Sequence, residues 1–177
     1  MSLRYGIGIG GSGAFAARIV DDGIAAIAAR LVGVGRIVGR SRSFANPAWG
    51  GVTRAPFVNA AVVVEAPWTA ATLLDELFVI ERAFGRVRGQ KNAARTLDLD
   101  VLWSSSPVSA AAGSAAAARP EPTVPHPRLC ERAFAVRLLV EAMDNAGVVV
   151  DGALRAAAWR HGLAPLTALP AIENRTA

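Results

Sequence analysis

The chain shows two hydrophobic patterns, one with the period of a strand and one with the period of a helix. Residues 57–66 contain the run Val62-Val63-Val64, which is typical of a strand buried on both faces. Similar apolar segments predict further strands at 3–9, 34–44 and 96–103. The first of these runs into glycines at 10–13, which predict a turn.

The clearest helix is predicted at residues 69–84, with Thr69 as its N-cap and Gly85 as its stop. The apolar stripe of this helix consists of Leu73, Leu77, Ile80 and Phe84. The same period predicts helices at 15–31 and 129–145. Residues 148–160 are expected to add a short strand and a final helical turn or two.

The resulting order of elements is β-α-β-β-α-β-α. This order predicts an α+β fold of the ferredoxin-like, split βαβ kind, in which helices pack on an antiparallel sheet. No repeat and no second domain is apparent, so residues 1–163 are expected to form a single domain. Within it, residues 104–122 are a low-complexity Ser/Ala/Pro loop, and residues 164–177 are expected to be a loose tail.

Composition narrows the class of protein. Hydrophobic residues make up 53% of the 177 residues, which is far above the range of disordered chains. No apolar run reaches the length of a membrane span, and the first residues are a poor signal peptide. Cys130 is the single cysteine, which excludes an internal disulfide and fits a reducing compartment. We therefore expect a cytoplasmic protein without membrane contacts.

The net charge of +5 comes almost entirely from arginine, since Lys91 is the single lysine. Arginine binds phosphate oxygens two at a time, so an anionic partner is expected, either a nucleotide or a nucleic acid. A nucleic-acid module on this fold needs aromatic residues interleaved with basic ones, and no such run is present. The nucleotide is therefore favoured, and no nucleic-acid partner is expected.

Asp98 and Asp100 are the most informative polar residues. In the predicted strand they share one face, while Leu97, Leu99 and Val101 share the other. Their backbone positions lie about 6.6 Å apart along a strand. Carboxylates at this spacing can serve one magnesium ion or two. The alternative is a strand with an ordinary solvated face.

Basic residues directly precede this strand and favour a phosphate site. They are Arg86, Arg88, Lys91 and Arg95. A cationic cluster beside two carboxylates suits a metal-bound polyphosphate, with metal on the carboxylates and arginines on the outer oxygens. The alternative is a set of exposed salt bridges, each worth little. His126 lies between two prolines and can donate to a phosphate, although a turn histidine with a satisfied partner is the simpler interpretation.

The glycines of "GIGIGGSG" match the G-x-G-x-x-G pattern but do not predict a dinucleotide site. They lie inside the first strand rather than after it, and no acidic residue ends the second strand. No lysine follows a glycine loop, so a Walker A phosphate loop is also excluded.

Three stretches resemble the 6-hydroxymethyl-7,8-dihydropterin pyrophosphokinase family of folate biosynthesis. They are "FVNAAVVVEA", "GRVRGQKNAARTLDLDVLW" and "VPHPRLCERAFAV", in the family's order, and the resemblance covers residues 5–159. It implies a ferredoxin-like enzyme that transfers diphosphate from ATP to the hydroxymethyl group of the pterin and releases AMP. The pathway would be that of folate or of a related pterin cofactor.

The resemblance also implies roles for individual residues. Asp98 and Asp100 would bind two Mg²⁺ ions. The residues expected on the ATP side are Glu81, Arg86, Arg88, Lys91, Arg95, His126 and Arg132, with Arg86 and Arg95 also counted as catalytic. The residues expected to hold the pterin are Pro47, Trp49, Phe57, Asn59 and Phe134.

The sequence departs from the family pattern at several points. Gly10-Gly11-Ser12 replaces the usual G-S-N, and Asn46 replaces a threonine before Pro47. The loop "GQKNAA" is short and lacks an aromatic residue and an arginine, so Lys91 would have to supply the charge. These changes leave an alternative open, a pterin- or nucleotide-binding homologue with weak or no transfer activity. Such a protein would act as a partner of other pterin-pathway enzymes.

Overall fold

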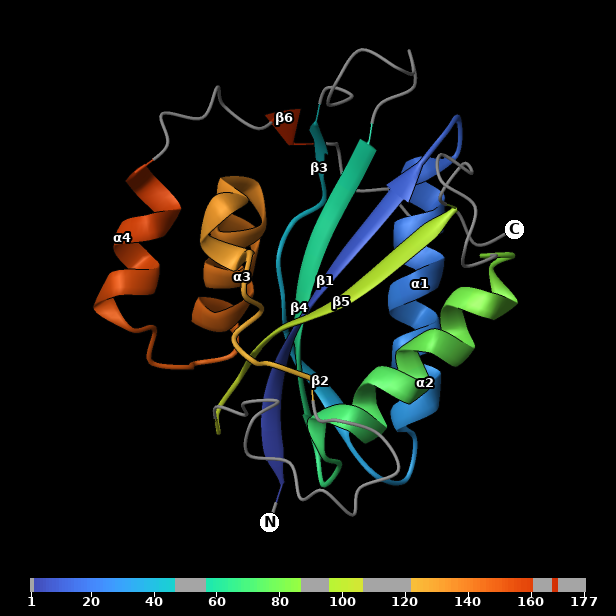
Figure 1. Ribbon diagram of the computed structural model, residues 1–177. Coiled ribbons are helices and arrows are strands. Elements are labelled where there is room, and N and C mark those ends of the chain that lie inside the picture. Colours follow the sequence, from blue (N-terminus) through green and yellow to red (C-terminus); the bar gives the residue numbers. More distant parts are fainter. Residues whose placement is uncertain (1, 47–56, 87–95, 107–121, 161–166, 169–177) are drawn as a thin grey trace.

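The computed structural model describes residues 2–46, 57–86, 96–106, 122–160 and 167–168 (Figure 1). The strands are β1 (Leu3–Ser12), β2 (Arg36–Arg40), β3 (Phe44–Asn46), β4 (Phe57–Ala66), β5 (Leu97–Ser104) and β6 (Thr167–Ala168). The helices are α1 (Ala16–Leu31), α2 (Ala70–Ala83), the 3-10 turn η3 (Leu129–Glu131), α3 (Ala133–Asn145) and α4 (Gly152–Arg160).

The strands form one antiparallel sheet in the order β5-β1-β4-β3-β6, with β2 also paired to β4. Helices α1 and α2 cover one face of this sheet, and α3 and α4 lie on the other (Figure 1). The predicted α+β class with an antiparallel sheet is therefore confirmed. Among the described residues, no helix is both long and apolar enough to cross a membrane.

The central strand β1 separates the two cores. Its bulky residues Tyr5, Ile7 and Ile9 are buried under α1 and α2. The alternate residues on the α3 side are glycines, and a Cβ atom on Gly6 would lie only 2.3 Å from Leu139 Cδ1 of α3. Because glycine has no side chain, α3 packs directly on β1 and the face farther along the strand is left bare.

Strand β4 and helix α2 match their predictions closely. Val62, Val63 and Val64 are fully buried, as the predicted burial on both faces requires. The Thr69 side chain accepts a hydrogen bond from Thr72 N at 3.1 Å, which caps α2. Gly85 follows the helix with a φ of +78°, a conformation that glycine adopts without strain.

Other segments differ from the predictions. The predicted turn at 10–13 is wrong for residues 10–12. Strand β1 continues through them, because it pairs there with β4 and β5. The predicted strand 34–44 is split into β2 and β3, and the Ser41 hydroxyl between them accepts from Ala61 N at 2.8 Å. The Ser41 side chain thus provides the hydrogen-bond acceptor for β4 at the point where the strand is interrupted.

The C-terminal third also differs. The predicted helix at 129–145 begins as η3 and is interrupted at Arg132, whose φ and ψ of −110° and 78° are not helical. No strand forms at 148–151, whereas the predicted final helical turns are confirmed as α4. Within the predicted tail, Thr167–Ala168 pairs with β3 as β6. Most of the predicted loop at 104–122 lies outside the described residues.

Candidate active site

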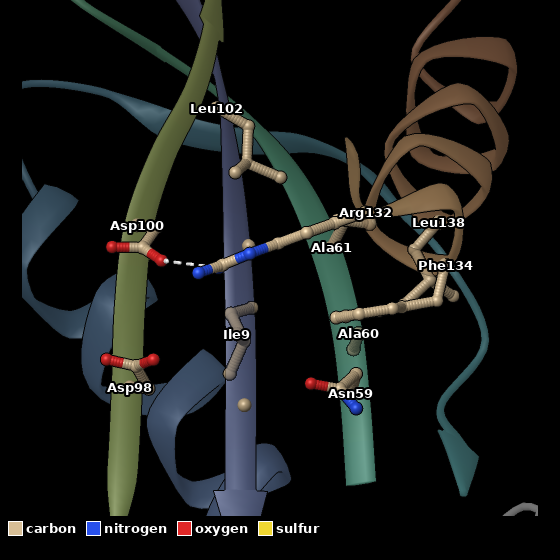
Figure 2. Close-up of a pocket in the computed structure, with 13 residues that line it drawn as sticks. Ile9, Asn59, Ala60, Ala61, Asp98, Asp100, Leu102, Arg132, Phe134 and Leu138 are labelled. Carbon is tan, nitrogen blue, oxygen red and sulfur yellow. Dashed lines mark ion pairs between the residues drawn. The ribbon is translucent and has the colours of Figure 1, made fainter. Parts of the chain in front are cut away.

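The aspartate pair, Asp98 and Asp100, lies on the face of β5 that looks toward α3 (Figure 2). The intervening Leu97, Leu99 and Val101 are buried on the other face, against α1 and α2. The apolar residues therefore fix which way the strand is turned, because a slip by one residue would bury the carboxylates instead.

Glycines form the floor beside the aspartate pair. Gly10 of β1 lies opposite Asp98 on one side and Asn59 of β4 on the other. Gly8 lies opposite Asp100 in the same way. We call Gly8 and Gly10 the glycine floor. A Cβ atom on Gly10 would lie 3.1 Å from Asn59 Oδ1, so only glycine leaves the space between Asp98 and Asn59 open.

The pocket above the floor is closed by the start of α3. Arg132 and Phe134 line it together with Asn59 and the aspartate pair. Figure 2 shows Arg132 reaching across β1, with its Nη1 atom 3.7 Å from Asp100 Oδ2. The pocket therefore has an acidic wall on β5, and an amide and an aromatic ring on the opposite side.

A second arginine reaches the aspartate pair from the end of α2. Arg86 forms ion pairs with both Asp98 and Glu81. Each aspartate thus has its own guanidinium, Arg86 for Asp98 and Arg132 for Asp100. Arg132 lines this pocket, whereas Arg86 reaches Asp98 from the end of α2 and lies outside the pocket lining.

The surroundings of Asp100 disfavour its negative charge. Partial burial, followed by the charge of Asp98, raises the pKa of Asp100 above its usual range, and His126 and Arg132 oppose this rise. Two carboxylates that repel each other are stabilised when a divalent cation binds between or beside them.

The fit to magnesium depends on the number of protein ligands. Among the described residues, no group of three or more His, Cys, Asp or Glu side chains could hold a metal ion. Magnesium usually keeps several water ligands and binds through one or two carboxylates plus substrate phosphates. The aspartate pair therefore fits magnesium that arrives with a polyphosphate, and does not fit a metal enclosed by protein.

The raised pKa of Asp100 has a consequence for stability. Because its folded-state pKa exceeds the unfolded value, the ionised side chain destabilises the folded protein at neutral pH, and protonation relieves this in acid. Asp100→Asn should therefore stabilise the protein at neutral pH, by less than about 1 kcal/mol because solvent screens a partly exposed group. Thermal unfolding should show that the difference in Tm between Asp100→Asn and wild type becomes smaller as pH falls. A lower Tm for the variant than for wild type at neutral pH would contradict this prediction.

His126 borders the site with one ring nitrogen already engaged. Its backbone N–H donates to Leu102 O at 2.9 Å, which fastens the loop to β5. Its Nδ1 accepts from Arg128 N at 3.1 Å. In the neutral ring the proton therefore resides on Nε2, which is the nitrogen that can donate to an anion.

The described residues include only part of the predicted site. Asp98, Asp100, Asn59, Arg132 and Phe134 line one pocket. Phe57 lies on β4 two positions before Asn59 and is half-buried, outside the lining of that pocket. Glu81, Arg86 and His126 are also outside that lining, and His126 lines a second pocket next to Trp103. Five further predicted residues lie outside the described residues, namely Pro47, Trp49, Arg88, Lys91 and Arg95.

Glu81 occupies a place that the sequence did not reveal. We expected it to contact the nucleotide, but its side chain is only 1% exposed and accepts a hydrogen bond from Leu99 N at 2.8 Å. A nucleotide contact would require the carboxylate to leave this position. One signal was present in the sequence, since Glu81 follows Leu77 by four residues and so extends the apolar stripe of α2.

The glycine floor was also missed as part of the site. The sequence analysis excluded a dinucleotide loop there and placed Gly10 in a turn, but it gave neither glycine a role in the site. The signal was their alternation with Ile7 and Ile9, which on a strand leaves one face without side chains.

Comparisons with known proteins identify the family of the chain. Residues 6–144 match the family profile of 7,8-dihydro-6-hydroxymethylpterin-pyrophosphokinase. The chain is 33% identical over 117 residues to the 2-amino-4-hydroxy-6-hydroxymethyldihydropteridine pyrophosphokinase of Methylorubrum extorquens, covering 66% of this chain and 68% of that protein. It is 31% identical over 137 residues to the Mycobacterium leprae protein of the same name. That match covers 75% of this chain and 72% of the Mycobacterium leprae protein. The chain therefore belongs to the 7,8-dihydro-6-hydroxymethylpterin-pyrophosphokinase family.

Proposed function

We propose that this protein transfers diphosphate from ATP to the hydroxymethyl group of 6-hydroxymethyl-7,8-dihydropterin and releases AMP. The observation that carries the proposal is the aspartate pair on one face of β5, with an arginine on each carboxylate. Membership of a family that uses ATP as co-substrate supports it. The product would serve folate or a related pterin cofactor, and the single cysteine fits a reaction in the cytoplasm.

The reaction moves two phosphoryl groups in one step. The pterin hydroxyl oxygen forms a bond to the β-phosphorus of ATP, and the bond from that phosphorus to the α,β-bridging oxygen breaks. The hydroxyl loses its proton, and AMP leaves with the electron pair of the broken bond. Positioning and charge neutralisation account for most of the catalysis in reactions of this kind.

Asp98 and Asp100 would hold two Mg²⁺ ions, which when bound neutralise phosphate charge and help to align the reacting oxygens. With a cation on the aspartates, Arg86 and Arg132 would turn from the carboxylates to phosphate oxygens, which arginine binds with two parallel hydrogen bonds. His126 would donate from Nε2 to the same anion. Arg88, Lys91 and Arg95 would add positive charge on the same side.

The pterin would lie above the glycine floor. Asn59 offers an amide donor and acceptor to the edge of the ring, and Phe134 offers an aromatic face. Asn59, Gly10 and Asp98 lie side by side on three neighbouring strands. A pterin ring held by Asn59 would therefore direct its hydroxymethyl group toward the aspartate pair. Phe57, Pro47 and Trp49 would complete this side of the pocket.

The proposal is tested by mixing the purified protein with ATP, Mg²⁺ and 6-hydroxymethyl-7,8-dihydropterin and following AMP by chromatography. AMP should form only when the pterin is present. Pterin binding by calorimetry without AMP would contradict transfer and favour the binding homologue. AMP formation that does not depend on pterin would indicate ATP hydrolysis instead.

A further inference from the structure

Helix α2 carries one buried carboxylate that reaches the outer edge of β5. Glu81 Oε1 accepts a hydrogen bond from Leu99 N at 2.8 Å. Leu99 stands between Asp98 and Asp100, so this hydrogen bond holds the backbone at the midpoint of the aspartate pair. Glu81 also forms an ion pair with Arg86, which in turn pairs with Asp98. One side chain therefore contacts both the strand and the arginine beside the site.

The hydrogen bond from Leu99 replaces a missing strand partner. Among the described residues β5 pairs only with β1, so its outer edge has no neighbouring strand. A buried N–H without an acceptor destabilises a fold, and the Glu81 carboxylate supplies that acceptor.

A carboxylate is a costly choice for this position if packing is its only role. Glu81 follows Leu77 on the apolar stripe of α2 and is 1% exposed. Burying a charge removes its hydration, and apolar replacements of buried ion pairs are often neutral or stabilising. The other α2 glutamate in a described ion pair, Glu76 with Arg30, keeps a quarter of its side chain exposed.

We propose that Glu81 is a positioning residue for the aspartate pair and for Arg86, and does not itself bind the nucleotide. By holding Leu99, it fixes the direction in which Asp98 and Asp100 leave the strand. By sharing Arg86 with Asp98, it retains that arginine at the edge of the site when Asp98 binds a cation. The catalytic part of this inference rests on the proposed transfer reaction.

Two substitutions separate the two contacts of Glu81. Glu81→Ala removes both the acceptor for Leu99 and the charge that pairs with Arg86. Glu81→Gln keeps an oxygen acceptor for Leu99 and removes only the charge. If the hydrogen bond positions the strand, the glutamine variant should behave between wild type and alanine.

The first readout needs no catalysis. Amide hydrogen exchange of Leu99, measured by NMR, should accelerate about tenfold in Glu81→Ala and remain close to wild type in Glu81→Gln. Binding of Mn²⁺ with ADP, followed by electron paramagnetic resonance, should weaken about tenfold in Glu81→Ala and less in Glu81→Gln. Unchanged Leu99 exchange together with unchanged Mn²⁺ binding in Glu81→Ala would overturn the proposal.

The second readout is the dependence of AMP formation on Mg²⁺ concentration. Glu81→Ala should raise the Mg²⁺ concentration at half-maximal rate and lower kcat, and both should be partly restored in Glu81→Gln. The KM for pterin should change by less than about twofold, because Asn59 and Phe134 are untouched. A direct nucleotide contact would instead raise the KM for ATP equally in both variants at saturating Mg²⁺.

Two controls on the same helix distinguish positioning from general loss of stability. Leu77→Ala removes a buried side chain one turn away and should lower Tm without changing the Mg²⁺ requirement. Glu76→Ala breaks the exposed pair with Arg30 and should change neither. A Leu77→Ala variant with the same Mg²⁺ requirement and Leu99 exchange as Glu81→Ala would overturn the proposal.

If wild type forms no AMP, the proposed function fails, whereas the exchange and Mn²⁺ measurements still decide the role of Glu81.

Discussion

Replacing Asp98 or Asp100 with alanine should lower the rate of diphosphate transfer at least about a hundredfold while the protein stays folded. Each substitution removes a carboxylate from the side of β5 that faces the pocket. The strand itself is held by Leu97, Leu99 and Val101, which are buried on the opposite side. The loss should therefore appear in AMP formation and in Mn²⁺ binding, with circular dichroism and Tm close to those of wild type.

Asp144 provides a matched control for the aspartate pair. It is an acidic residue in an ion pair with an arginine, Arg155, but it lies at the end of α3 on the surface. Asp144→Ala should leave AMP formation within about twofold of wild type, because an exposed pair contributes little. Near-normal turnover in either Asp98→Ala or Asp100→Ala would show that the pair does not carry the metal chemistry.

Gly10→Val should lower kcat/KM for the pterin about a hundredfold without unfolding the protein. A Cβ atom at this position already lies 3.1 Å from Asn59 Oδ1, and the methyl groups of valine would project into the space between Asp98 and Asn59. Valine is favourable in a strand, so the backbone pairing of β1 should persist. Gly10→Ala should have a smaller effect, because Asn59 needs to shift only slightly.

Ile7→Val is the control for Gly10→Val on the same strand. Ile7 is buried in the opposite core under α1 and α2 and does not line the pocket, so this change should lower stability by about 1 kcal/mol and leave pterin affinity unchanged. The two variants should thus separate stability from binding. If Gly10→Val binds pterin as tightly as wild type, the glycine floor does not form part of the pterin site.

The parts of the fold that could be predicted from sequence are those with strong local signals. The valines of β4 and the capped, periodic α2 were predicted nearly to the residue. Asp98 and Asp100 point to the same face because side chains alternate between the two faces along any strand. In each case the information lies within one segment and needs no knowledge of its neighbours.

The features that were missed depend on contacts between distant segments. Gly10 to Ser12 resemble a turn locally, yet pairing with both β4 and β5 extends the strand through them. Glu81 lies on the apolar stripe of α2, but its hydrogen bond with Leu99 N depends on the docking of α2 beside β5. The break between β2 and β3 depends on a hydrogen bond from the distant Ala61 N to Ser41.

The most direct measurement locates the metal–nucleotide complex itself. Mn²⁺ added with a non-hydrolysable ATP analogue broadens backbone amide signals of nearby residues in NMR spectra. Signals from Asp98, Asp100 and the glycine floor should disappear first, while those from Ala28, in α1 across the sheet, should persist. Persistence of the β5 signals, with broadening centred elsewhere, would contradict the assignment of the aspartate pair as the metal site.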